Sequence, residues 1–279
     1  MSDSRPVRIA AAAVVMSTLF LATPAGAQGT PAPATAQSAP VTAAMVPGCA
    51  ELASALNAVV RNDTRLRDWA NLARYREANA ALASPTAGQS RVVFMGDSIT
   101  DFWQQPRFGG FFQQKPYVDR GISGQTTPQM LLRFRRDVID LAPKVVVILA
   151  GVNDIAGNTG PTTDEDIEGY LEAMAELATA HGIEVVLASI MPVSEYHVAA
   201  GVPQTTTRPM ARVKAVNAWM EKYAARHGHP YLDYFSAMVD EKGLLRADLS
   251  EDALHPNAKG YAIMAPLAES AIAKALGRQ

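Results

Sequence analysis

The run Val145-Val146-Val147-Ile148-Leu149-Ala150 is continuously apolar and largely β-branched, and the loop Gly151-Val152-Asn153-Asp154 follows it directly. β-Branched side chains favour extended backbone, and an unbroken apolar run is typical of a strand that is buried on both faces. Such strands belong to parallel sheets that helices cover on both sides. The run therefore predicts a central strand of an α/β fold, with a polar loop at its carboxyl end.

Shorter apolar runs of the same kind flank this strand in the sequence. They cover residues 91–95, 117–122, 184–190 and 230–235. Amphipathic stretches with helical spacing alternate with them, over residues 128–141, 164–181, 209–227 and 257–276. This alternation predicts a three-layer α/β/α sandwich with a mostly parallel five-stranded sheet and right-handed crossovers. Ligands of such sheets bind outside the carboxyl ends of the strands.

The first residues have the pattern of an export signal. Arg5 and Arg8 precede an apolar run over residues 9–22, and Ala25-Gly26-Ala27 provides a small-residue cleavage site. The run is shorter than the roughly 20 residues that span a bilayer, which disfavours a membrane anchor. We therefore expect a signal peptide over residues 1–27, export to the periplasm or the medium, and no stable membrane insertion.

The next segment separates this signal from the folded part. Residues 28–47 are rich in Ala, Pro and Thr without apolar periodicity, which predicts a linker. The folded domain is expected over residues 48–279, with an additional helical segment over residues 48–85. Cys49 suggests a lipid-modified cysteine, but its distance from the apolar run and the preceding Pro47 argue against lipidation.

Composition narrows the possible functions. The chain has 279 residues, 48% of them hydrophobic, and 25 Lys and Arg against 27 Asp and Glu, so it can bury a sizeable core but has no excess of basic residues for a nucleic-acid surface. A single cysteine excludes an intrachain disulfide, and neither a multi-cysteine zinc site nor a His-Glu-x-x-His motif is present. We expect no metal, no organic cofactor and no nucleic-acid partner.

Ser98 follows the first expected strand in the sequence Gly96-Asp97-Ser98-Ile99-Thr100. At the carboxyl end of a parallel strand its hydroxyl and its N–H would face the ligand side of the sheet. The alternative is that Asp97 or Ser98 only caps the following helix. Thr100 stands where the Gly-x-Ser-x-Gly elbow has its second glycine, which disfavours the α/β-hydrolase fold.

His255 is the histidine best placed to serve as a base. Asp252 lies three residues earlier, so one turn can bring its carboxylate to the imidazole Nδ1 and leave Nε2 free to accept a proton. A surface turn in an acidic loop is the alternative. His181 and His227 each precede a glycine at the end of a helical pattern, and we expect them to be helix C-terminal residues.

Asn153 and Gly124 could supply hydrogen-bond donors for an oxyanion at the same edge of the sheet. Both are also ordinary turn residues. Together with Ser98 and His255 they resemble the four motif blocks of the GDSL, or SGNH, hydrolases over residues 91–276. The blocks are Gly96-Asp97-Ser98-Ile99, Arg120-Gly121-Ile122-Ser123-Gly124, Gly151-Val152-Asn153-Asp154 and Asp252-Ala253-Leu254-His255-Pro256. One departure is Asp119, where many relatives have Asn.

This resemblance implies a flavodoxin-like fold and a serine esterase that works through an acyl-enzyme without metal or organic cofactor. It implies a triad of Ser98, His255 and Asp252, and an oxyanion hole from the N–H groups of Ser98 and Gly124 with the Asn153 side chain. An inactive binding module is the alternative of another class, but no triad residue is missing.

The expected substrate is a small-molecule or glycan ester with a short acyl group, above all acetyl. Resemblance to acetylesterase-like relatives favours this substrate, and so does the long polar segment over residues 191–209, which could shape the binding site. The alternative is that this segment is a connector without substrate contacts. Expected substrate contacts are Asp97, Trp103 and Tyr196. The alternative is a lysophospholipase or thioesterase, whose acyl groove aromatic residues near the first helix would line: Phe102, Trp103, Phe111 and Phe112.

Overall fold

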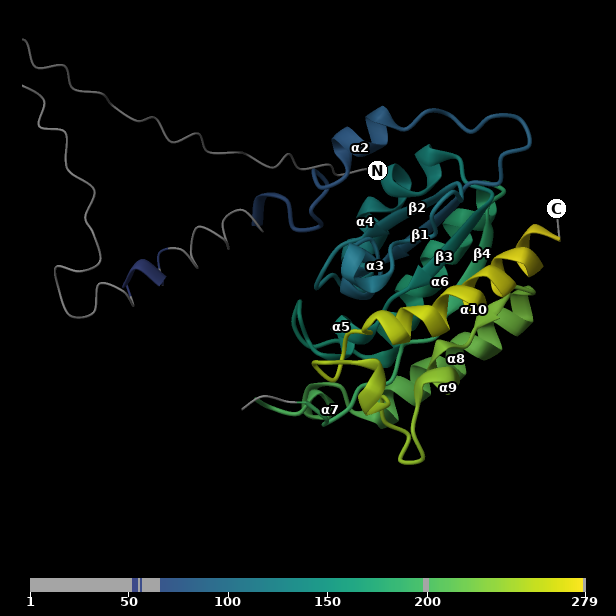
Figure 1. Cartoon of the computed structure of the whole chain (residues 1–279). Helices are drawn as coiled ribbons and strands as arrows, with labels where there is room; N and C mark the ends of the chain where they lie inside the picture. Colours follow the sequence, from purple (N-terminus) through teal and green to yellow (C-terminus); the bar gives the residue numbers. More distant parts are fainter. Residues whose placement is uncertain (1–51, 55, 57–65, 198–200, 278–279) are drawn as a thin grey trace, which may run out of the picture. The chain divides into compact units, whose positions relative to one another are not determined.

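Figure 1 presents the computed structural model of the chain, which describes residues 52–54, 56, 66–197 and 201–277. The expected signal peptide over residues 1–27, the linker over residues 28–47 and Cys49 lie outside the described residues. No described helix is both long and apolar enough to cross a membrane.

Five parallel strands form a single sheet in the order β2-β1-β3-β4-β5. They are β1 (Val92–Gly96), β2 (Tyr117–Gly121), β3 (Val145–Leu149), β4 (Glu184–Ala188) and β5 (Tyr231–Leu232). Every residue of β1 and β3 is buried, as continuous apolar runs require. The expected α/β sandwich is confirmed, and all pairings between the described strands are parallel.

Helices cover both faces of this sheet (Figure 1). α4 packs against α6 and α6 against α8, while α10 contacts β3, β4 and β5. The helices are α2 (Arg76–Ala81), α3 (Ser98–Trp103), α4 (Thr127–Asp137), α5 (Val152–Ile155), α6 (Asp164–Ala180), α7 (Gln204–Thr207), α8 (Met210–His227), α9 (Tyr234–Met238) and α10 (Ala258–Leu276).

The helix ends follow local sequence signals. α4 and α6 begin with capping boxes in which Thr126 and Thr163 are the N-caps. α8 ends at His227, where Gly228 takes the left-handed conformation, and His181 is the C-cap of α6. The expectation that His181 and His227 end helices is confirmed.

The segment before β1 is less helical than expected. Of the helical segment expected over residues 48–85, the described residues 52–54, 56, 66–67 and α2 are helical, while residues 68–75 form turns and bends. Asp68 accepts hydrogen bonds from the backbone N–H groups of Leu72 and Ala73. Side chains of α4 donate to the carbonyls of residues 69 and 72, and Gln125, just before α4, donates to that of residue 70. These carbonyls therefore accept hydrogen bonds from side chains outside the segment, and not from the backbone N–H groups that would continue a helix.

The sheet register brings three loops together. Gly96 at the end of β1 pairs with Gly121 of β2 on one side and with Leu149 of β3 on the other. The segments that carry Ser98, Gly124 and Asn153 therefore begin at the same edge of the sheet, which is where ligands of this fold class bind.

Candidate active site

Ser98 is the first residue of α3, directly after the turn that ends β1. A Cβ atom at Gly96 would lie 2.0 Å from Thr100 Oγ1, so only glycine permits this tight turn. Asp97 is the N-cap, and its Oδ1 accepts a hydrogen bond of 2.9 Å from the Ile99 N–H. Because Asp97 caps the helix, the Ser98 hydroxyl is available for another partner.

That partner is His255. Ser98 Oγ lies 2.8 Å from His255 Nε2, and His255 Nδ1 lies 2.6 Å from Asp252 Oδ2. Asp252 Oδ1 also accepts hydrogen bonds from the backbone N–H groups of His255 and Leu254. Partial burial raises the pKa of Asp252, but the hydrogen bonds from the His255 ring and backbone outweigh it, so the pKa lies well below its usual range. The structure thus brings the three residues together, with an ionised carboxylate behind the imidazole.

The turn between Asp252 and His255 contains local strain. Ala253 has a φ of 67°, in the left-handed region that non-glycine residues avoid at a cost of roughly 1 kcal/mol. Its side chain is buried, and its carbonyl accepts a hydrogen bond of 2.9 Å from the Ser194 N–H. The Phe102 ring lies 4.9 Å from the imidazole. These contacts hold the turn in the conformation that aims His255 at Ser98.

Two backbone N–H groups, in the segments that follow β1 and β2, have no protein acceptor among the described residues. In the part of the chain that the structure describes, neither the Ser98 N–H nor the Gly124 N–H donates a hydrogen bond. Gly124 has a φ of 80°, and its carbonyl accepts a hydrogen bond of 3.0 Å from Asn158 Nδ2. Free N–H groups at a helix start and in a fixed turn are the donors that a developing oxyanion needs.

The buried Asn153 amide is held beside them, near the start of α5. Its Nδ2 donates to the Gln125 carbonyl at 3.0 Å and makes a longer contact of 3.4 Å to Asp97 Oδ2. The shorter bond orients the amide, and the longer contact is weak enough for a substrate oxygen to replace it. Burial raises the pKa of Asp97 to about 6, opposed by the bond from Ile99.

Of the three expected substrate contacts, Asp97 and Trp103 are buried, and Tyr196 is partly exposed. Asp97 is fully buried and serves α3 and Asn153. Trp103 is 3% exposed and packs edge-on against Phe94, so it belongs to the core. Tyr196 donates its hydroxyl to Asp240 Oδ2 at 2.7 Å. The structure therefore corrects the expectation that Asp97 and Trp103 contact substrate, because their side chains are enclosed by protein.

Several residues that support the site were not found from the sequence. The Arg133 side chain is 0% exposed and donates to the carbonyls of Gly96 and Arg120, where β1 and β2 end. It also donates to the Gln125 side chain at 2.6 Å. On an amphipathic helix an arginine usually faces solvent, so the sequence of α4 offers no signal for this role.

A cavity of about 920 Å³ opens beside Gly124. Its lining combines the loops after β2 and α5 with residues 67–73, which precede the sheet. None of its lining residues comes from the long segment over residues 191–209 that was expected to shape the site. The space next to the oxyanion donors is therefore bounded by the N-terminal segment of the described chain.

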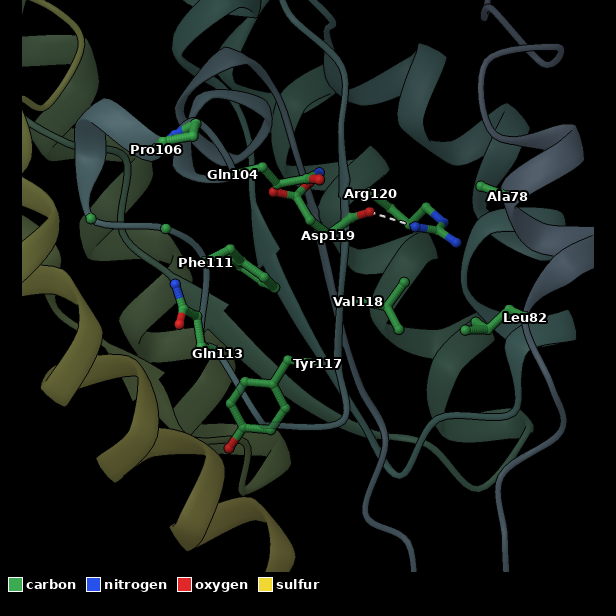
Figure 2. Close-up of a pocket in the computed structure, with 12 residues that line it drawn as sticks. Ala78, Leu82, Gln104, Pro106, Phe111, Gln113, Tyr117, Val118, Asp119 and Arg120 are labelled. Atoms are coloured by element: carbon green, nitrogen blue, oxygen red, sulfur yellow. Dashed lines mark hydrogen bonds between the residues drawn. The ribbon is translucent and has the colours of Figure 1, made fainter.

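A second cavity, of about 670 Å³, lies along the outer edge of β2 (Figure 2). Neither cavity is lined by Ser98, His255 or Asp252, and the second one also lacks Gly124. Asp119 is 4% exposed there, next to the Gln104 side chain, and its Oδ1 accepts a hydrogen bond of 2.7 Å from the Gly121 N–H. Burial raises the pKa of Asp119 to about 7, against the opposing effect of this bond.

The raised pKa of Asp119 predicts that the free energy of unfolding depends on pH. The folded state retains a proton on Asp119 that the unfolded chain releases above its ordinary pKa of 3.8, so the stability it contributes is lost as pH rises through about 7. Asp119→Asn should increase the free energy of unfolding by at most about 4 kcal/mol at pH 8, and by less at pH 5. Urea unfolding at both pH values, with the exposed Asp140→Asn as control, measures the difference. An equal effect of Asp119→Asn at pH 5 and pH 8 would show that this carboxyl does not titrate between them.

Residues 94–263 match the model of the GDSL-like Lipase/Acylhydrolase family. The structure of a GDSL-like lipase from Bacteroides thetaiotaomicron VPI-5482 is 41% identical, covers 74% of this chain and 98% of its own, and has a TM-score of 0.67. A candidate acylhydrolase from Bacteroides fragilis NCTC 9343 is 40% identical over 74% of this chain and 97% of its own, with a TM-score of 0.69. The uncharacterized lipoprotein YqeF of Bacillus subtilis (strain 168) is 35% identical over 124 residues, which are 39% of this chain and 51% of that relative. This chain thus matches about half the length of that relative.

Proposed function

Because the chain belongs to the GDSL-like lipase/acylhydrolase family, and is therefore an ester hydrolase, we propose that Ser98 is its nucleophile, His255 its general base and Asp252 the residue that orients His255. The observation that supports this assignment is the continuous path of hydrogen bonds, 2.8 Å from Ser98 Oγ to His255 Nε2 and 2.6 Å from His255 Nδ1 to Asp252 Oδ2.

The proposed reaction has two similar halves. His255 Nε2 accepts the hydroxyl proton while Ser98 Oγ attacks the ester carbonyl, and the N–H groups of Ser98 and Gly124 with the Asn153 amide stabilise the oxyanion. His255 then gives the proton to the leaving alcohol, which departs and leaves an acyl-Ser98. Water, deprotonated by His255, attacks this ester, and His255 returns the proton to Ser98 Oγ as the acid leaves. The Asp252 carboxylate stabilises the imidazolium in both halves.

Asn153→Ala should lower kcat by about 10²- to 10³-fold with little change in KM. The reason is that its amide donor acts on the charge of the tetrahedral intermediate and much less on the neutral ester. Initial rates over a range of ester concentrations separate the two constants, and circular dichroism checks the fold. A large rise in KM with kcat preserved would instead make Asn153 a ground-state binding residue.

For the substrate we propose short-chain esters, above all acetyl esters, of a carbohydrate or another polar alcohol. Half of the residues that line the cavity beside Gly124 have amide or hydroxyl side chains, which suit a polyhydroxyl group. Three of the four aromatic residues considered for a fatty acyl groove, Trp103, Phe111 and Phe112, pack together and make ring contacts with Phe94. The fourth, Phe102, lies 4.9 Å from the His255 ring. Long acyl chains have no comparable apolar channel among these residues.

A series of p-nitrophenyl esters tests the acyl preference. We expect kcat/KM to be highest for acetate and to fall steadily toward octanoate, because a longer chain finds no apolar enclosure next to Ser98. O-Acetylated xylo-oligosaccharides and a lysophospholipid, assayed in parallel, test the alcohol. A maximum at eight or more acyl carbons, or preference for the lysophospholipid, would replace this proposal with the lysophospholipase or thioesterase alternative.

We also propose that residues 1–27 direct export and are removed, and that residues 28–47 link this signal to the enzyme. The charged, apolar and small-residue order of residues 1–27 supports this, as does similarity to a relative named as a lipoprotein. Mass spectrometry of the protein exported by a bacterial host should find a chain that begins at Gln28. An intact Met1 on the exported protein would contradict the cleavage.

A further inference from the structure

We infer that residues 67–73 form a sugar-binding wall beside the oxyanion donors, with the Trp69 indole as the surface on which an uncharged sugar ring of the substrate stacks. These residues precede the region that matches the family model, which begins at residue 94. The inference rests on the proposed function in one respect, because it assigns the alcohol part of the ester to this wall.

The cavity that this wall bounds adjoins the proposed reaction centre at Gly124, although none of the triad residues lines it. It is lined by Gly124, whose N–H is a proposed oxyanion donor, and by Gln125, whose carbonyl holds the Asn153 amide at 3.0 Å. Its volume of about 920 Å³ far exceeds what an acetyl group fills, so it can hold the alcohol part of an ester. The inference places the sugar ring in this space, with its acylated hydroxyl directed past Gly124 toward Ser98.

α4 holds the wall in place through backbone contacts. Gln129 Nε2 donates to the Trp69 carbonyl at 2.6 Å, and Arg136 Nη1 donates to the Leu72 carbonyl at 2.7 Å. Between them Gln125 Nε2 donates to the Ala70 carbonyl at 2.7 Å. None of these contacts involves the side chain of Trp69. A surface fixed in advance loses little conformational entropy when it binds a ligand.

Trp69 is a large apolar side chain left at the surface of a polar cavity. It is 42% exposed, and it makes no ring contact with another aromatic side chain among the described residues. The neighbouring Ala70, in contrast, is buried. A flat indole face matches the C–H face of a sugar ring, and its burial under a ligand would be favourable.

The rest of the lining matches the hydroxyl groups of such a ring. In the described part of the chain, the Asn71 side chain and the Asn158 Oδ1 atom have no protein hydrogen-bond partner. Amide groups both donate and accept, as sugar hydroxyls do. The charged side chains of the lining, Arg67 and Asp68, have opposite signs, which favours a neutral glycan over an anionic one.

The test compares binding and turnover in Trp69→Ala and Trp69→Phe. Titration calorimetry with xylohexaose and with chitohexaose, neither of which carries an ester to hydrolyse, measures binding alone. We expect at least one of them to bind the wild-type protein, Trp69→Ala to raise its Kd about tenfold or more, and Trp69→Phe to keep most of the affinity. Leu132→Ala, an exposed apolar residue of α4 outside the cavity lining, is the matched control and should bind like the wild type.

Turnover adds a second readout. Trp69→Ala should reduce kcat/KM on an O-acetylated xylo-oligosaccharide about tenfold more than on p-nitrophenyl acetate. This loss should appear as a rise in KM, with kcat preserved. Failure of both oligosaccharides to bind, or equal affinities of the wild type and Trp69→Ala, would overturn the inference. Persistence of full activity in Ser98→Ala would overturn the assignment of the nucleophile but not this inference, because the binding measurement does not depend on Ser98.

Discussion

Ser98→Ala should lower kcat for p-nitrophenyl acetate by about 10⁵- to 10⁶-fold while the protein remains folded. The reason is that the variant has no atom to form the acyl-enzyme, and only the oxyanion donors and binding contacts remain to assist direct attack by water. Initial rates at saturating ester measure the loss. Circular dichroism and urea unfolding should match the wild type, because Ala fits the small, buried position at the start of α3.

The control is Ser236→Ala, on the exposed surface of α9 and outside the site, which should retain wild-type turnover. Residual activity of more than about 1% in a purified Ser98→Ala preparation would contradict the assignment, because loss of a nucleophile normally removes far more.

His255→Ala should cause a loss of similar size, again about 10⁵- to 10⁶-fold in kcat. Without the imidazole 2.8 Å from Ser98 Oγ, the hydroxyl has no acceptor for its proton and the leaving alcohol has no donor. The two residues act as one unit, so Ser98→Ala/His255→Ala should be no slower than the slower single variant. A double-mutant cycle on kcat tests this directly.

A matched histidine control is available in His181→Ala. This residue ends α6 and its Nδ1 lies 2.8 Å from the Leu177 carbonyl, so its removal should affect stability slightly and turnover not at all. Additive losses in the double variant, or normal turnover in His255→Ala, would show that Ser98 is activated by a different group.

The sheet and the helices that cover it could be predicted because their signals are local. An unbroken apolar run such as residues 145–149 is compatible with few environments other than a strand covered on both faces. The contact between Asp252 and His255 could also be predicted from the sequence, because a spacing of three residues lies within one turn. That Ser98 and His255 meet across 157 residues followed only from the order of the four motif blocks.

The surroundings of the site could not be predicted, because they depend on side chains that bond distant backbone. Turns over residues 68–75 replace the expected helix since Gln125, Gln129 and Arg136 bond their carbonyls. Trp103 was expected to contact substrate, yet its position on α3 places its side chain in the aromatic core around Phe94. Neither arrangement has a signature in the spacing of residues along the chain.

Covalent labelling tests the central claim most directly. The wild-type protein is treated with a fluorophosphonate, which reacts with serine nucleophiles that a base activates, and is then digested and analysed by mass spectrometry. The account predicts one adduct, on Ser98, that forms in step with the loss of esterase activity and is absent from Ser98→Ala and from His255→Ala. An adduct on another serine, or full inactivation while Ser98 remains unmodified, would contradict it.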